Sequence, residues 1–81
     1  MLERLQTDRI IIGAKQSLRA IREGRAVFVV IADDAEDKVR GPVYDACRAR
    51  GLTPSPEKLT MAQLGAIYGV KRAAVVVTTG V

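Results

Sequence analysis

The residues best suited to chemistry in this sequence follow a short apolar run that ends at a glycine. Ile10–Ile12 are β-branched and predict a short buried strand, and Gly13 lets the backbone turn without a Cβ in the way. A helix is expected to begin at once, and its first amides have no intrahelical partner, so they attract anions. The residues at this predicted anion-binding surface are Gly13, Ala14, Lys15, Gln16 and Arg19.

The helix that follows the glycine has two different faces. Lys15, Arg19 and Arg22 are spaced i, i+4, i+7 and share one face, while the other face carries Ala14, Leu18 and Ile21. One helix therefore buries an apolar stripe and offers cations on the other side. The alternative is that the cations are an ordinary solvated face and that Gly13 is an ordinary turn glycine.

The size and charge of the chain limit the functions open to it. The chain has 81 residues, which we interpret as one domain spanning residues 1–81, too small for a large enclosed substrate cavity. Its formal net charge is +4, and the basic residues are concentrated in residues 1–25. An acidic group follows at residues 33–37, so we expect one end of the domain to be basic and its partner to be a polyanion.

Several chemistries are excluded by composition. There is one cysteine and no histidine, which rules out an internal disulfide, histidine-based triads and most zinc sites. We expect no metal and no cofactor. No apolar run approaches the ~20 residues that a membrane-spanning helix needs, and the start lacks a signal-peptide pattern, so we expect a cytoplasmic protein without membrane contact.

The order of predicted elements indicates the fold class. Strands are expected at about 9–12, 26–32 and 72–78, with a weak edge strand at 52–56, where two prolines remove ladder donors. Helices are expected at about 14–23, at 37–50 and from 61 onwards, and residues 2–7 could form one or two further helical turns. This pattern predicts an α/β fold, a three-layer α/β/α sandwich with a small mixed four-stranded sheet.

Three local features refine the helices. Gly41-Pro42 lies inside the second helix and predicts either a kink there or a helix that begins at Pro42. Thr60 and Gln63 have the spacing of a capping box and should open the third helix. Cys47 falls on an apolar stripe, and we interpret it as a small core residue and not as a nucleophile.

Asp33 and Asp34 follow the central apolar strand, at the end where α/β proteins tend to place functional groups. They could form part of a metal or phosphotransfer site. No histidine, Ser-Lys pair or further acidic ligand accompanies them in sequence, so we favour the interpretation that they cap the start of the next helix.

Three segments of the chain resemble a known family. They are Ile11–Arg19, Val30–Asp34, and Leu64–Gly69 with Ala73–Val75, and they occur in the same order as in the kink-turn-binding ribosomal proteins, in particular the short bacterial YbxF-like branch. The similarity covers nearly the whole chain. It implies RNA binding without catalysis, directed at a kink-turn, which is a duplex bent by a three-nucleotide bulge beside tandem sheared G·A pairs.

The resemblance also implies roles for individual residues. Gly13 and Ala14 would allow close backbone approach, Lys15 and Gln16 would reach base edges, and Arg19 would supply a cation one turn further on. The second recognition loop would contain Lys58, Leu59, Thr60 and Met61.

One pair departs from the wider family. Archaeal and eukaryotic relatives usually have Asn-Glu where this chain has Lys15-Gln16, and lysine where it has Arg19. Lysine donates to guanine O6 or N7 but offers no acceptor, so base discrimination should differ from that of the Asn-Glu members.

The residue pattern and the family resemblance both indicate structured RNA as the partner. Base edges in A-form RNA are reached by a helix only where the duplex is bent, bulged or widened. Leu59 and Met61 could cover an unstacked base, or alternatively contact the core of the domain itself. We expect a monomer that binds a kink-turn RNA, with the ribosome as a further candidate partner.

Two other functions remain open at this stage. One is a small phosphate-ligand or phosphotransfer domain that uses Asp33 and Asp34. The other is a structural ribosome-associated protein whose basic face makes non-specific phosphate contacts.

Overall fold

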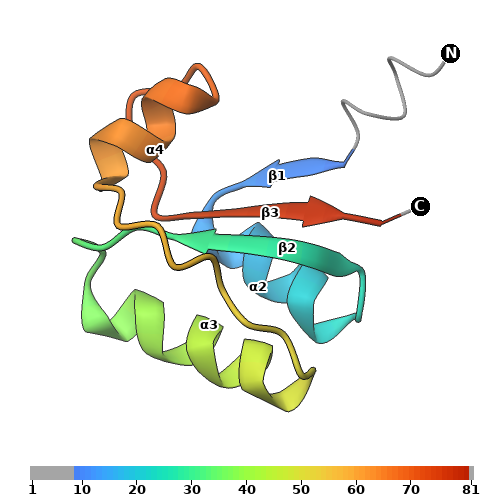
Figure 1. Cartoon of the computed structure of the whole chain (residues 1–81). Helices are drawn as coiled ribbons and strands as arrows, with labels where there is room; N and C mark the ends of the chain where they lie inside the picture. The colour runs from blue at the N-terminus through green and yellow to red at the C-terminus, as the bar shows by residue number, and fades with distance from the viewer. Residues whose placement is uncertain (1–8, 81) are drawn as a thin grey trace, which may run out of the picture.

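A computed structural model describes residues 9–80 of the chain. Within them, three strands form one sheet: β1 (Ile10–Ile12), β2 (Ala26–Ile31) and β3 (Val75–Thr79). Their order is β1-β3-β2, and β3 pairs antiparallel with both neighbours. The last strand in sequence is therefore the central strand of the sheet (Figure 1).

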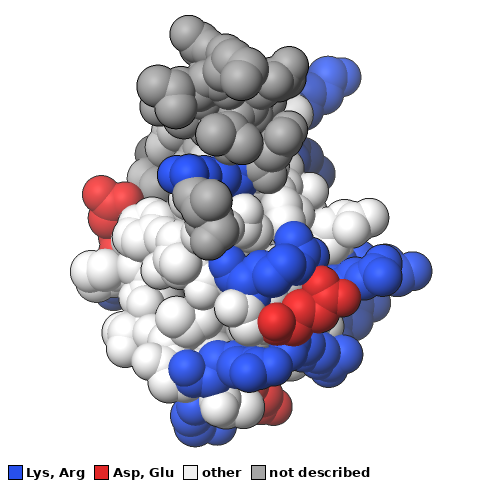
Figure 2. Space-filling view, turned by 90° about the vertical axis from the view of Figure 1, so that its right-hand side faces the viewer, with Lys and Arg blue, Asp and Glu red and all other residues white. Residues whose placement is uncertain are grey.

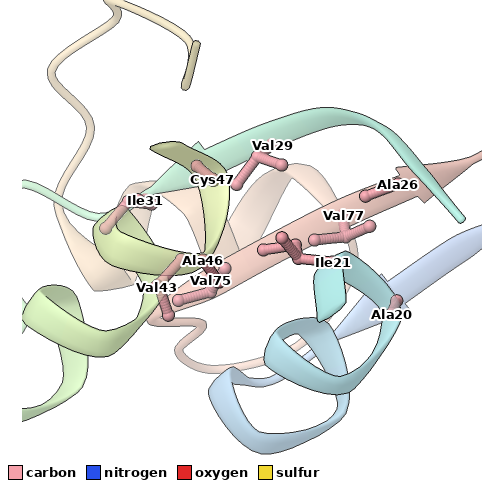
Figure 3. Packing of buried hydrophobic residues seen from close by; sticks show 10 residues of the cluster. All are labelled: Ala20, Ile21, Ala26, Val29, Ile31, Val43, Ala46, Cys47, Val75 and Val77. Atoms are coloured by element: carbon pink, nitrogen blue, oxygen red, sulfur yellow. The ribbon is translucent and has the colours of Figure 1, made fainter. Parts of the chain in front are cut away.

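Helices cover both faces of this sheet, which confirms the α/β/α sandwich. α2 (Ala14–Arg22) and α3 (Asp37–Ala49) lie on one face, and α4 (Met61–Ile67) lies on the other (Figure 1). The side chains of β3 alternate between two apolar clusters. Val75 and Val77 pack with α2 and α3 (Figure 3), while Val76 packs with α4.

The prediction of a mixed, four-stranded sheet was wrong for the part of the chain that the structure describes. The sheet has three strands with antiparallel pairing only, and residues 52–56 run beside β2 without joining it. The Ser55 amide donates to the Val29 carbonyl at 2.8 Å, but Pro54 and Pro56 on either side have no N–H to extend a ladder. The helical turns expected at residues 2–7 lie outside the described residues.

One of the two predictions about helix starts was wrong and the other is confirmed. α3 begins at Asp37 and continues through Pro42, so the alternative that it starts at Pro42 was wrong. Packing explains this: Val43, Ala46 and Cys47 bury the far half of the helix, and most helical stability comes from such packing. The Thr60–Gln63 capping box is confirmed, with both of its hydrogen bonds formed, at 3.1 and 2.9 Å.

Cys47 is a core residue, as predicted. Its side chain is buried among the residues of α2, α3 and the sheet (Figure 3). Burial raises the pKa of the thiol because the charged thiolate is poorly solvated there. The thiol therefore stays protonated at neutral pH and unreactive. Within residues 9–80, no helix has the length and apolar character needed to span a membrane.

Gly65 fixes how closely α4 approaches the chain that leads into β3. A Cβ at this position would lie 2.7 Å from the backbone nitrogen of Arg72 and 2.8 Å from its Cα. Backbone atoms on both sides would have to move to relieve that contact. Only glycine therefore allows this packing.

We predict that Gly65→Ala lowers the free energy of unfolding by about 1–3 kcal/mol, the usual cost of overpacking a well-filled site. Urea denaturation followed by circular dichroism measures it. The matched control is Gly41→Ala in α3, where an added Cβ meets no atom within 4 Å. The control should gain stability from its better helix propensity. An alanine at position 65 that is as well tolerated as one at 41 would contradict this account.

Candidate nucleic-acid interface

The sheet brings the glycine-led helix start and the loop before α4 to the same end of the molecule. The amide of Gly13 donates to the Val75 carbonyl at 2.9 Å, and the amide of Ala32 donates to the Ala74 carbonyl at 2.7 Å. The next amide, that of Asp33, donates to the Leu59 carbonyl at 2.7 Å. Two consecutive residues at the start of β3 therefore hold both segments together.

Apolar packing supports the same arrangement. Ile12, the residue before the glycine, shares one cluster with Leu59 and Met61 from the loop before α4. We call residues 13–16 the glycine tip and residues 58–61 the recognition loop. They lie at the same end of the sheet, on either side of β3, and side chains from both are exposed there.

The glycine tip has the backbone geometry that its sequence predicts. Gly13 precedes α2 with φ of 115° and ψ of 145°, a conformation that side-chain-bearing residues rarely adopt. α2 has no side-chain cap and no acidic residue in its first turn. The first amide to find a helical partner is that of Ser17, which donates to the Gly13 carbonyl. The three preceding amides have no hydrogen-bond partner within residues 9–80 and are suited to an anion.

The two faces of α2 are arranged as predicted. Ile21 is fully buried, and Ala14 and Leu18 pack against the same core cluster. On the opposite face Lys15 and Gln16 are exposed, and neither forms a salt bridge or side-chain hydrogen bond within residues 9–80. Their polar ends are free to meet a ligand.

Arg19 lies on the exposed face with a partner. Its Nε lies 3.3 Å from Glu23 Oε2, and the other oxygen of Glu23 accepts from Arg25 Nε at 2.8 Å. The hydrogen bonds from Arg25 and then Arg19 lower the pKa of Glu23, so its carboxylate stays ionised. An exposed ion pair of this kind is weak, so Arg19 can exchange Glu23 for a phosphate.

Sequence reasoning overlooked Ser17. This residue of α2 is fully buried, and its hydroxyl lies 3.5 Å from the carbonyl oxygens of Ile11 and Val75. It joins the first turn of α2 to both β1 and β3 and so helps to position the glycine tip. The only feature of the sequence that indicates this role is a serine among the apolar positions of an amphipathic helix. That pattern does not identify the backbone carbonyls that the hydroxyl contacts.

The recognition loop is less exposed than a solvated loop. Lys58 and Thr60 are exposed, while Leu59 and Met61 are half-buried and pack against the protein's own apolar cluster. The alternative of a contact with the domain's own core therefore holds in part for both apolar residues. Both residues keep part of their side chain exposed at the end of the sheet that also carries the glycine tip.

The prediction that Asp33 and Asp34 cap the next helix was wrong. The N-cap of α3 is Glu36, with no side-chain capping bond. Asp34 Oδ1 instead accepts from the backbone amide of Met61, the first residue of α4, at 2.7 Å. The acidic pair directly follows β2, where the amide of Asp33 is bonded to the recognition loop, so the nearest free amides belong to α4.

The amides at the starts of α4 and α2 therefore differ in whether a side chain accepts from them. Asp34 and Thr60 occupy amides of α4, whereas the start of α2 has no such side chain. Among the described residues, no group of three or more histidine, cysteine or acidic side chains could hold a metal ion. Among α2, α3 and α4, only α2 lacks both a capping side chain and an acidic residue in its first turn that would oppose an anion, since α3 has Asp37 there.

Comparison with known proteins identifies the class. Residues 2–81 match the profile of the ribosomal protein L7Ae/L30e/S12e/Gadd45 family. The chain belongs to this family, which confirms the resemblance drawn from its motifs.

Individual relatives agree with the assignment. The chain is 33% identical over 61 residues to an RNA-binding protein of Geobacillus sp. (strain WCH70), covering 75% of this chain and 73% of the relative. It is 50% identical over 32 residues to the RNA-binding protein YbxF of Geobacillus stearothermophilus, covering 40% and 39%. A solved structure of a protein of unknown function from Bacillus halodurans C matches with a TM-score of 0.79 at 18% identity, covering 91% and 74%, which supports the fold.

We predict that Asp34→Ala lowers the free energy of unfolding by about 0.5–2 kcal/mol, the usual range for loss of a helix-capping acceptor. Asp34→Asn should lower the free energy of unfolding much less, because the side-chain amide oxygen of asparagine can still accept from the Met61 amide. Urea denaturation compares the three proteins with and without added Mg²⁺. Stabilisation of the parent protein by Mg²⁺ that disappears in Asp34→Ala would instead support a metal or phosphotransfer site.

Proposed function

We propose that this protein binds RNA, recognises kink-turns, and stabilises their bent form. The observation that carries the proposal is the glycine tip, an uncapped helix start with exposed Lys15 and Gln16, at the same end of the sheet as the recognition loop. The relatives named RNA-binding proteins and the family assignment support RNA as the ligand. The kink-turn itself comes from the motif resemblance.

The chemistry of the tip suits a widened groove. Gly13 and Ala14 have little side-chain bulk, so the helix start can approach the nucleic acid closely. Lys15 donates to guanine O6 or N7, and the amide of Gln16 can both donate and accept at a base edge. Arg19 lies one turn further on and is suited to a phosphate.

The recognition loop supplies a second contact of a different kind. Leu59 and Met61 present apolar surface at the end of the sheet that carries the tip, suited to an unstacked base of the bulge, while Lys58 and Thr60 border it with polar groups. The capping box and Asp34 hold this loop in place before any RNA arrives. A preformed surface lowers the entropy cost of binding.

Binding alone can produce the structural effect on the RNA. A ligand that prefers the bent form shifts the population towards it by its differential affinity for the two forms. No catalytic group or energy source is required, so we propose a non-enzymatic role. The phosphotransfer alternative has no supporting observation, since Asp34 is occupied by the Met61 amide.

A fluorescence-transfer titration tests this proposal. A kink-turn duplex labelled at both ends, under conditions in which the free RNA is mainly extended, should show higher transfer as protein is added. A duplex with Watson–Crick pairs in place of the G·A pairs is the control and should not respond. Unchanged transfer at saturating protein would disprove stabilisation of the bend.

Replacement of Lys15 tests whether the tip reads bases. Lys15→Gln should weaken binding to the kink-turn by about 1–3 kcal/mol, the range for loss of a specific base contact, and weaken plain-duplex binding less. Lys71→Gln, an exposed lysine between α4 and β3, is the charge-matched control. Fluorescence anisotropy at one salt concentration provides the affinities. Equal losses on both RNAs would mean that Lys15 contacts phosphate only.

A further inference from the structure

A second cluster of cations lies at the end of the sheet opposite the glycine tip. We call it the arginine end and define it as Arg22, Arg25, Arg48 and Arg50, which are all exposed. The Arg25 carbonyl accepts from the amide of Gly80, just after β3, whereas the tip is bonded to Val75 at the start of β3. The five residues of β3 place Arg25 about 13 Å from the tip at ~3.3 Å per residue, while Arg22 also borders a depression along α2 that includes Lys15 and Arg19.

Figure 2 views the molecule from this end and shows lysine and arginine side chains gathered on it, with few acidic ones between them. The carboxylates within the cluster are Glu23, paired with Arg25, and Asp45, paired with Arg48. Within residues 9–80, Arg22 and Arg50 have no carboxylate partner. The arginine end therefore carries excess positive charge.

The arginines are also held in place relative to one another. Arg50 Nη2 donates to the backbone carbonyl of Arg22, and its guanidinium packs over Gly24 in the turn after α2. Arg22 and Arg50 together flank a shallow depression between α2 and α3, whose floor includes Ala46 and Ala49. An arginine fixed by one hydrogen bond keeps its other donors available in a defined direction.

The types of cation differ between the two ends. All four lysines of the chain lie near the starts of helices or beside α4, at positions 15, 38, 58 and 71. The opposite end has only arginines, whose planar guanidinium forms paired hydrogen bonds to phosphate oxygens. Arg22, Arg48 and Arg50 lie at the carboxyl ends of α2 and α3, where the helix dipole favours a cation, but Arg25 lies two residues past the C-cap of α2, so the dipole does not account for the whole cluster.

We propose that the arginine end is a second RNA-binding surface, which binds the phosphate backbone of a further duplex segment while the glycine tip binds elsewhere. The partner is assigned from charge complementarity: a duplex presents closely spaced phosphates, and clustered guanidinium groups match them. The protein would then hold two RNA segments at opposite ends. This inference does not depend on recognition of a kink-turn by the tip.

The test compares two charge-matched double variants on a plain 20-base-pair RNA duplex by fluorescence anisotropy. Arg22→Gln/Arg48→Gln should weaken binding about ten-fold and reduce the slope of log affinity against log salt by about 2, one unit per lost phosphate contact. Lys38→Gln/Lys71→Gln removes the same charge elsewhere and should weaken binding less than three-fold. Equal losses in the two variants would overturn the proposal.

Further measurements test whether the glutamine variant is folded, whether charge alone restores binding, and whether the surface prefers RNA to another polyanion. Circular dichroism checks that the glutamine variant is folded; if it is not, Arg48→Gln alone should weaken duplex binding about three-fold. Arg22→Lys/Arg48→Lys, which restores the charge, should recover affinity to within three-fold of the parent protein. Polyglutamate that binds the parent protein as tightly as the duplex at the same salt would overturn the assignment to RNA.

A two-colour experiment tests simultaneous binding. Protein saturated with labelled kink-turn RNA should still bind a second, differently labelled plain duplex, and the Arg22→Gln/Arg48→Gln variant should not. Failure of the parent complex to take up the second duplex would overturn the bivalent arrangement. Failure of the first RNA to bind would reject the proposed function of the tip only, because the plain-duplex assay judges the arginine end separately.

Discussion

The backbone hydrogen bonds at the start of β3 are the constraint on which the candidate interface depends. The carbonyls of Ala74 and Val75 accept from the amides of Ala32 and Gly13, which lie at the ends of the two outer strands. Because the first residue of β3 and the residue just before it hold both neighbours, the glycine tip and the recognition loop cannot separate unless the sheet itself opens. A central strand that comes last in the sequence thus assembles a surface from segments more than 40 residues apart.

The starts of α2 and α4 differ in how their free amides are satisfied. α4 is a short helix, and Thr60, Gln63 and Asp34 satisfy its first turn from within the protein. α2 has no such side chain, and Gly13 leaves its approach open. An end that is capped contributes to stability, whereas an end left unpaired at the surface can take its partner from a ligand.

The distribution of charge adds a second level of organisation. Cations follow α2 from Lys15 at the tip to Arg22 at the arginine end, and Glu23 pairs with two of the arginines near its end. A small domain has little interior in which to build a binding cavity, so its surfaces must serve as its sites. The proposed contact with two segments of RNA would use the cations at both ends of one helix.

The sequence alone determined the features that depend on neighbouring residues. Gly13 before a basic helix, the Thr60–Gln63 capping box and the burial of Cys47 follow from backbone preferences and apolar spacing, and all three are present. The tertiary structure decided the rest. Asp34 caps a helix 27 residues further along, and residues 52–56 contact β2 without joining the sheet. These outcomes depend on which distant segments the packed layers bring within hydrogen-bonding distance, and local sequence patterns do not encode those distances.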